Sequence, residues 1–119
     1  MKKILIVDDD LDVRQALKKL LSKYKPLLAR SSREAEMIFA RDKDILGVIL
    51  LDGYLHRNDP QVNTLALTRL IRASGFTRPI VAMSSDASFR AKQVEAGCSH
   101  NIYKDNHEEI LALVERELA

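Results

Sequence analysis

Acidic residues follow two separate apolar runs of the sequence. The aspartates at positions 8–10 come directly after Ile4–Val7, and Asp52 comes directly after Val48–Leu51. If the two runs are neighbouring parallel strands, their carboxyl ends meet at one edge of a sheet and the carboxylates converge there. Carboxylates this close repel one another, so the arrangement is costly unless a cation lies among them. Because the available ligands are all oxygens, the pattern predicts Mg²⁺, which binds one or two carboxylates together with a phosphate.

An aspartate after a strand also often caps the next helix. We expect that simpler role for Asp10 and Asp12. Capping does not explain why two different strands both end in acid. Asp8, Asp9 and Asp52 are therefore predicted to form one metal-binding group.

Two further polar residues stand at predicted strand ends. Ser84 follows Pro79–Met83, and Lys104 follows the weaker run Asn101–Tyr103. A lysine beside carboxylates can neutralise a phosphoryl oxygen, and a serine hydroxyl can donate a hydrogen bond to another. Either residue alone carries little information. Their joint position at the ends of successive strands predicts a pocket for a phosphoryl group.

The elements that would position these residues alternate between short apolar runs and longer segments of helical periodicity. Strands buried on both faces of a parallel sheet have this appearance beside the helices that cover them. The predicted strands are Ile4–Val7, Pro26–Ala29, Val48–Leu51, Pro79–Met83 and Asn101–Tyr103.

Helical patterns and caps occupy the intervals between the strands. The predicted helices run from Asp10 to Lys23, from a capping box at Ser31 and Glu34, around Leu67, Leu70 and Ile71, from Ser88 to Ala96 with a stop at Gly97, and from a cap at Asn106 with Glu109. Strand–helix units in succession, joined by right-handed crossovers, predict an α/β fold. We expect an open, doubly wound, five-stranded parallel sheet flanked by five helices, in one domain over residues 1–119.

The composition limits the class of protein. A chain of 119 residues is long enough for one domain with its own core. The formal net charge is +2, with Lys and Arg spread along the chain, which argues against a dedicated nucleic-acid surface. The single cysteine, Cys98, cannot form an intramolecular disulfide, and no segment approaches the roughly 20 apolar residues of a membrane-spanning helix. We expect a soluble cytoplasmic protein that binds neither nucleic acid nor membrane.

An ordered set of motifs runs through the chain, made of Ile4–Asp9, Ile49–Asp52, Pro79–Ser84, Gly97 and Lys104. Each piece is common, but the ordered set is specific. It resembles the receiver domain of bacterial two-component response regulators, and the resemblance extends from Lys2 to Leu118. It implies a flavodoxin-like receiver fold, in which ligands bind where the winding of the sheet reverses.

The resemblance also implies a function, which is acceptance of a phosphoryl group from a phosphohistidine. The donor would be a sensor histidine kinase or a phosphotransfer protein, and the output would pass through contacts with a downstream protein. Apart from this phosphorylation and its own dephosphorylation, no enzymatic activity is expected. The implied site consists of Asp52 as phospho-acceptor, Ser84 as switch hydroxyl, Lys104 as the cation beside the phosphate, and Asp8, Asp9, Asp52 and the backbone carbonyl of Tyr54 as Mg²⁺ ligands.

Some positions depart from the family pattern near the predicted output surface. Asp105 stands where the family has a proline after its lysine, so the usual cis peptide bond would be costly here. Asn101 stands where the family has an aromatic switch residue, and Tyr103 is an aromatic residue two positions later. These changes affect the expected transmission of the phosphorylation signal to the protein surface.

The loop after Asp52 departs as well. The segment 53–60 replaces the signatures of the family and is longer by two residues. We expect His56 and Arg57 to be solvated loop residues. Tyr54 and Asp86 each lie two residues beyond a site residue and are expected to obstruct the water that hydrolyses the acyl phosphate.

Other functions remain open at this point. A pseudo-receiver would bind partners without phosphorylation, and the departures at Asn101 and Asp105 are compatible with it. A magnesium-dependent phosphohydrolase of the haloacid dehalogenase type would need a second aspartate where Tyr54 stands. A flavin- or nucleotide-binding protein would need a glycine-rich loop after the first strand, where this chain has aspartates.

Overall fold

The computed structural model describes residues 2–56 and 61–119. Within these ranges, five parallel strands form one sheet in the order β2-β1-β3-β4-β5. The strands are β1 (Lys3–Val7), β2 (Leu27–Ala29), β3 (Leu46–Leu51), β4 (Ile80–Ala82) and β5 (His100–Asn101). The helices are α1 (Leu11–Leu20), the 3₁₀ turn η1 (Ser22–Tyr24), α2 (Ser32–Asp42), α3 (Leu65–Ala73), α4 (Ala87–Ala96) and α5 (His107–Leu118). The predicted α/β fold is confirmed.

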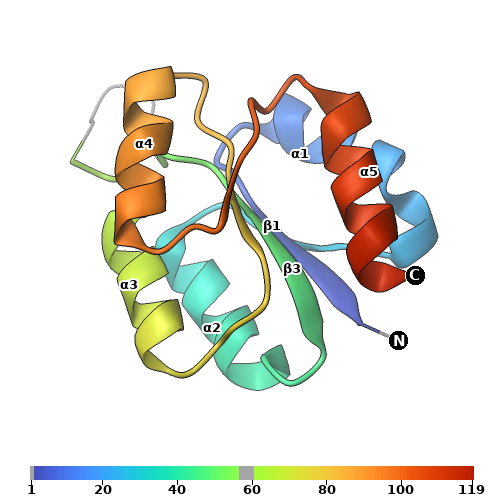
Figure 1. Cartoon of the computed structure of the whole chain (residues 1–119), viewed down its shortest axis with the longest axis horizontal. Helices are drawn as coiled ribbons and strands as arrows, with labels where there is room; N and C mark the ends of the chain where they lie inside the picture. The colour runs from blue at the N-terminus through green and yellow to red at the C-terminus, as the bar shows by residue number, and fades with distance from the viewer. Residues whose placement is uncertain (1, 57–60) are drawn as a thin grey trace.

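Alternating side chains of the strands divide the core into two layers. In β1, Leu5 and Val7 pack into one cluster with residues of α2 and α3, whereas Ile4 and Ile6 pack into a second cluster with residues of α1 and α5. A strand with period-two alternation buries both sets only when helices cover both faces. Figure 1 shows α1 and α5 side by side on one side of the sheet, and α2 and α3 on the other.

The winding of the sheet reverses between β1 and β3. From β1 the chain passes to β2 on one side, and it then returns to place β3 on the other side of β1. Val7 and Leu51, the last residues of β1 and β3, are partners in the register. The residues that follow them therefore meet at the point where open α/β sheets bind ligands.

Several element boundaries differ from the sequence prediction. Helix α1 ends at Leu20, before the predicted Lys23, and continues as η1, after which Lys25 takes a left-handed conformation with φ of 51°. The following Pro26 disfavours a right-handed helical conformation at Lys25, so the helical turn of η1 ends at Tyr24. In α3, Leu70 is 47% exposed although it shares the periodicity of the buried residues.

The caps of α2, α4 and α5 match the prediction. Ser31 accepts a hydrogen bond from the Glu34 amide, and Asn106 accepts one from the Glu109 amide. Helix α4 stops at Gly97, whose φ of 133° is unfavourable for other residues.

Among residues 2–56 and 61–119, no helix is both long and apolar enough to cross a membrane.

Candidate functional site

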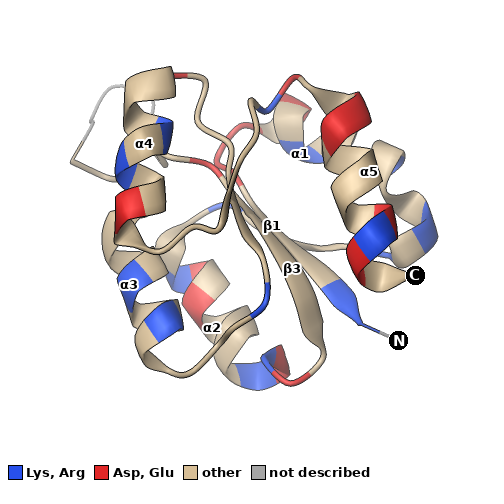
Figure 2. Cartoon of the chain, viewed as in Figure 1, with Lys and Arg blue, Asp and Glu red and all other residues tan. Residues whose placement is uncertain are grey.

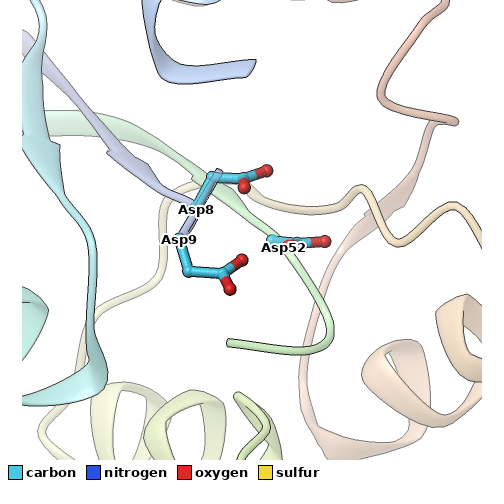
Figure 3. Close-up of side chains that lie close together, drawn as sticks. All are labelled: Asp8, Asp9 and Asp52. Carbon is cyan, nitrogen blue, oxygen red and sulfur yellow. The ribbon is translucent and has the colours of Figure 1, made fainter. Parts of the chain in front are cut away.

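Three carboxylates converge at the carboxyl ends of β1 and β3. Asp8, Asp9 and Asp52 each offer an oxygen within 4.8 Å of the others, and Figure 3 shows their carboxylates directed to the same side. Asp9 and Asp52 line a cleft of about 650 Å³, whereas Asp8 is fully buried and is not part of its wall. Figure 2 shows acidic positions where these strands end, while Lys and Arg are distributed over several helices. The cleft is lined by Asp9, Asp10, Leu11, Asp12, Asp52, Tyr54, Ser85 and Lys104.

Asp8 is fully buried directly after β1. Its Oδ1 accepts a hydrogen bond of 2.9 Å from the amide of Asp10, and its Oδ2 lies 3.3 Å from the Lys104 ammonium. Burial, followed by the charge of Asp52, raises the pKa of Asp8 to about 6, because both disfavour its ionised form. In the metal-free protein this carboxylate is held at a cost in free energy.

Asp52 is 5% exposed at the end of β3. Its amide donates to the Val7 carbonyl, and its Oδ1 accepts from the Gly53 amide at 2.8 Å and lies 3.2 Å from the ammonium of Lys104. Burial raises the pKa of Asp52, although Lys104 and the Gly53 amide act in the opposite direction. The hydrogen bonds thus fix the direction of the Asp52 side chain, and Lys104 only partly offsets the cost of burying its negative charge.

Lys104 places one ammonium between two carboxylates. Burial lowers the pKa of Lys104, but the charges of Asp52 and Asp8 and their hydrogen bonds raise it by more. Lys104 therefore remains charged, at the mouth of the cleft.

No peptide bond in the described ranges is cis, so the bond from Lys104 to Asp105 is trans.

The donor set fits a hard divalent cation. Asp8, Asp9 and Asp52 supply only oxygens, as Mg²⁺ requires. When all three are ionised and Lys104 is charged, the group carries two uncompensated negative charges. A divalent cation would cancel them, which gives a physical reason for burying two acids together.

Ser84 lies beside this group, not on the wall of the cleft. It is buried just beyond β4, its hydroxyl accepts a hydrogen bond of 3.2 Å from the Asp86 amide, and its Cβ lies close to Gly53. Ser85, which sequence reasoning missed, lines the cleft instead. No motif marks Ser85; only its position one residue after Ser84 in the loop indicates it.

Tyr54 lines the cleft and stacks on Phe89 of α4, with ring centroids 4.2 Å apart. Two aspartates of this region cap helices, whereas Asp12, which was also expected to cap, lies within the first turn of α1. Asp10 caps α1 by accepting from the Asp12 amide, as predicted. Asp86 caps α4 by accepting from Ser88, and it is absent from the lining residues of the cleft. Arg57 and the rest of residues 57–60 lie outside the described ranges.

Arg90 of α4 contacts both residues discussed for the aromatic switch position, Asn101 and Tyr103. The Arg90 guanidinium donates to the Asn101 side chain at 2.7 Å, lies 5.6 Å from the centroid of the Tyr103 ring, and donates to the Ser84 carbonyl at 2.7 Å. Tyr103 is 42% exposed and its hydroxyl donates to Asp105. Asn101 and Tyr103 thus share one surface and are linked to the loop after β4.

Comparison with known proteins decides the family. The model of the response regulator receiver domain matches residues 4–115. The chain belongs to the response regulator receiver family. Its strand order is therefore that of a receiver domain, as the motifs predicted.

Individual relatives of this receiver domain are distant. The response regulator MprA of Mycolicibacterium vanbaalenii is 32% identical over 106 residues, which are 86% of this chain and 43% of that protein. The chain thus spans less than half the length of that relative. The solved structure of the BeF3-activated DrrB receiver domain has a TM-score of 0.77 and 25% identity, covering 99% of this chain and 97% of that one. The chemotaxis protein CheY4 of Vibrio cholerae has a TM-score of 0.80 and 22% identity, covering 98% of each chain, and supports the fold alone.

Proposed function

We propose that this receiver domain accepts a phosphoryl group on Asp52 from a phosphohistidine, with Mg²⁺ bound by Asp8, Asp9, Asp52 and the backbone carbonyl of Tyr54. The observation that carries the proposal is the position of Asp52. Its carboxylate opens into the cleft, and the Lys104 ammonium lies 3.2 Å from one of its oxygens. A buried acid with a fixed cation at its side is suited to nucleophilic attack on a charged phosphorus.

The bonds of the side chain suggest how the transfer proceeds. Both the Gly53 amide and Lys104 contact Oδ1 of Asp52, so we assign Oδ2 as the attacking atom. The bond from Oδ2 to phosphorus forms as the bond from phosphorus to the donor imidazole breaks, in line. Charge then spreads over the equatorial oxygens, where Lys104 can neutralise one of them. Bound Mg²⁺ would supply further electrostatic stabilisation of these oxygens.

The acyl phosphate would reset by hydrolysis, so the domain would act as a switch and not as an enzyme with an external substrate. We propose that residues 1–119 form one such domain, that its donor is a sensor histidine kinase or a phosphotransfer protein, and that it acts in the cytoplasm through contacts with a protein effector. The BeF3-activated state of the DrrB receiver domain, at 25% identity, supports the same chemistry at this site.

Beryllofluoride binding tests this proposal. In the presence of Mg²⁺, we expect it to shift the backbone amide resonances of Asp52, Ser84, Ser85 and Lys104, because the ligand would sit among these residues. Asp52→Asn, which keeps the size of the side chain and removes its charge, should show no such shifts. Unchanged spectra of the parent protein at millimolar beryllofluoride and Mg²⁺ would instead identify a pseudo-receiver.

A further inference from the structure

Helix α4 carries a buried amide side chain that the site chemistry described above does not use. Gln93 is 0% exposed. Its Nε2 donates to the Leu51 carbonyl at 3.0 Å, and its Oε1 accepts from the Ser84 amide at 3.4 Å. Buried amide groups are disfavoured unless they are hydrogen-bonded, and both ends of this amide have partners. These bonds therefore join α4 to the last residue of β3 and to the first residue beyond Met83.

Thr64, the N-cap residue of α3, extends the same network. Its hydroxyl donates to the carbonyl of Asp52 at 2.5 Å and lies 3.5 Å from Nε2 of Gln93. Its amide donates to the carbonyl of Gly53 at 3.0 Å. The carbonyls of three consecutive residues centred on Asp52 are thus held by Gln93 and Thr64. We call these two side chains the acceptor clamp.

Neither member of the clamp lines the cleft. Both act on backbone, and together they join the segment that carries Asp52 to the segment that carries Ser84. The Ser84 peptide is held at both ends, since Gln93 accepts from its amide and Arg90 donates to its carbonyl at 2.7 Å. The Leu51 carbonyl also accepts a sheet bond of 3.0 Å from the Met83 amide, and Gln93 adds the link that reaches one residue further, to the Ser84 amide.

We propose that Gln93 is a positioning residue for phosphoryl transfer, which fixes the backbone on both sides of Asp52 relative to Ser84. This inference rests on the proposed function. A positioning error of about 1 Å far from the reacting atoms can slow a reaction by about 100-fold, so even partial loss of the clamp has a measurable effect. Gln93→Met keeps the length of the side chain and removes both hydrogen bonds.

The test measures phosphorylation by a small phosphodonor, acetyl phosphate, with Mg²⁺. We expect Gln93→Met to lower the rate at saturating acetyl phosphate by about tenfold. Its Mg²⁺ affinity should stay within twofold, because the hydrogen bonds of Gln93 go to Leu51, Ser84 and Thr64 and not to the carboxylates of the cleft. Ser74→Ala is the matched control, since it removes a hydroxyl that bonds the Ile71 carbonyl at the far end of α3 and should leave the rate unchanged.

Thr64 provides a second pair of variants that does not depend on the folding of Gln93→Met. Thr64→Ser keeps the hydroxyl and should keep the rate, whereas Thr64→Val should lower it. Equal rates for the parent, Gln93→Met and Thr64→Val would overturn the clamp and leave the proposed function standing. Parallel loss of rate and Mg²⁺ affinity in Gln93→Met would also overturn it, because that is the result of a purely structural role. Absence of phosphorylation in the parent protein would overturn both proposals.

Discussion

Replacing Lys104 with methionine is expected to slow phosphorylation of Asp52 by about 10²- to 10³-fold, the usual cost of removing one fixed donor to a developing charge. The ammonium lies 3.2 Å from Asp52 and 3.3 Å from Asp8, where it can contact an oxygen of the transferred group. Methionine retains the length and packing of the stem without the charge. The rate with acetyl phosphate and Mg²⁺ measures the effect.

Mg²⁺ binding separates this effect from damage to the fold. Lys104 and a metal ion both bind the carboxylates of Asp8 and Asp52, so the Mg²⁺ affinity of Lys104→Met should rise while its rate falls. Lys92→Met, which removes an exposed charge on α4, is the matched control and should match the parent protein. A rate for Lys104→Met within threefold of the parent rate would contradict the assignment.

Neutralising Asp8 should stabilise the metal-free protein at neutral pH and weaken its Mg²⁺ binding. The pKa of Asp8 is raised to about 6 from an ordinary value of 3.8, so between these values the folded state binds more protons than the unfolded state. The contribution of Asp8 to the free energy of unfolding therefore falls as pH rises through this window, by at most about 3 kcal/mol at about 1.4 kcal/mol per unit. Above this window, Asp8→Asn should be the more stable protein, by about 1 to 3 kcal/mol.

Urea unfolding of the parent and Asp8→Asn between pH 4 and pH 8, without metal, measures this difference. The two stabilities should converge at the acid end, where Asp8 is protonated. Asp44→Asn removes the same charge from an exposed position and should show no such divergence. Excess Mg²⁺ at neutral pH should reverse the order, because only the parent keeps all three carboxylates. Equal stability at every pH would show that burial of Asp8 carries no cost.

The sheet and the acidic group were predictable because they depend on local pattern. Val48–Leu51 is apolar throughout since both faces of β3 are covered, and an acid directly after such a strand lies at the carboxyl edge of the sheet. Lys104 was also predicted correctly at the cleft, although β5 is not Asn101–Tyr103. It consists of His100 and Asn101, and the Ile102 amide still bonds the Ala82 carbonyl beyond it.

The acceptor clamp was not predictable in this way. Gln93 shares the buried face of α4 with Phe89 and Ala96, and a glutamine at such a position carries no motif. Its role depends on the Leu51 carbonyl and the Ser84 amide, which are far away in sequence and meet only when the sheet is assembled. The link from Arg90 to Asn101 and Tyr103 has the same origin. Local sequence thus predicts which residue lies at the end of a strand better than it predicts the distant side chains that fix that residue in position.

The most direct test of Asp52 as phospho-acceptor is to locate the phosphoryl group chemically. The parent protein is incubated with acetyl phosphate and Mg²⁺, reduced with borohydride, which converts a phosphorylated aspartate to homoserine, and digested for mass spectrometry. We predict homoserine at position 52, dependent on both acetyl phosphate and Mg²⁺, and none in Asp52→Asn. Modification at another residue, or none in the parent protein, would contradict the account.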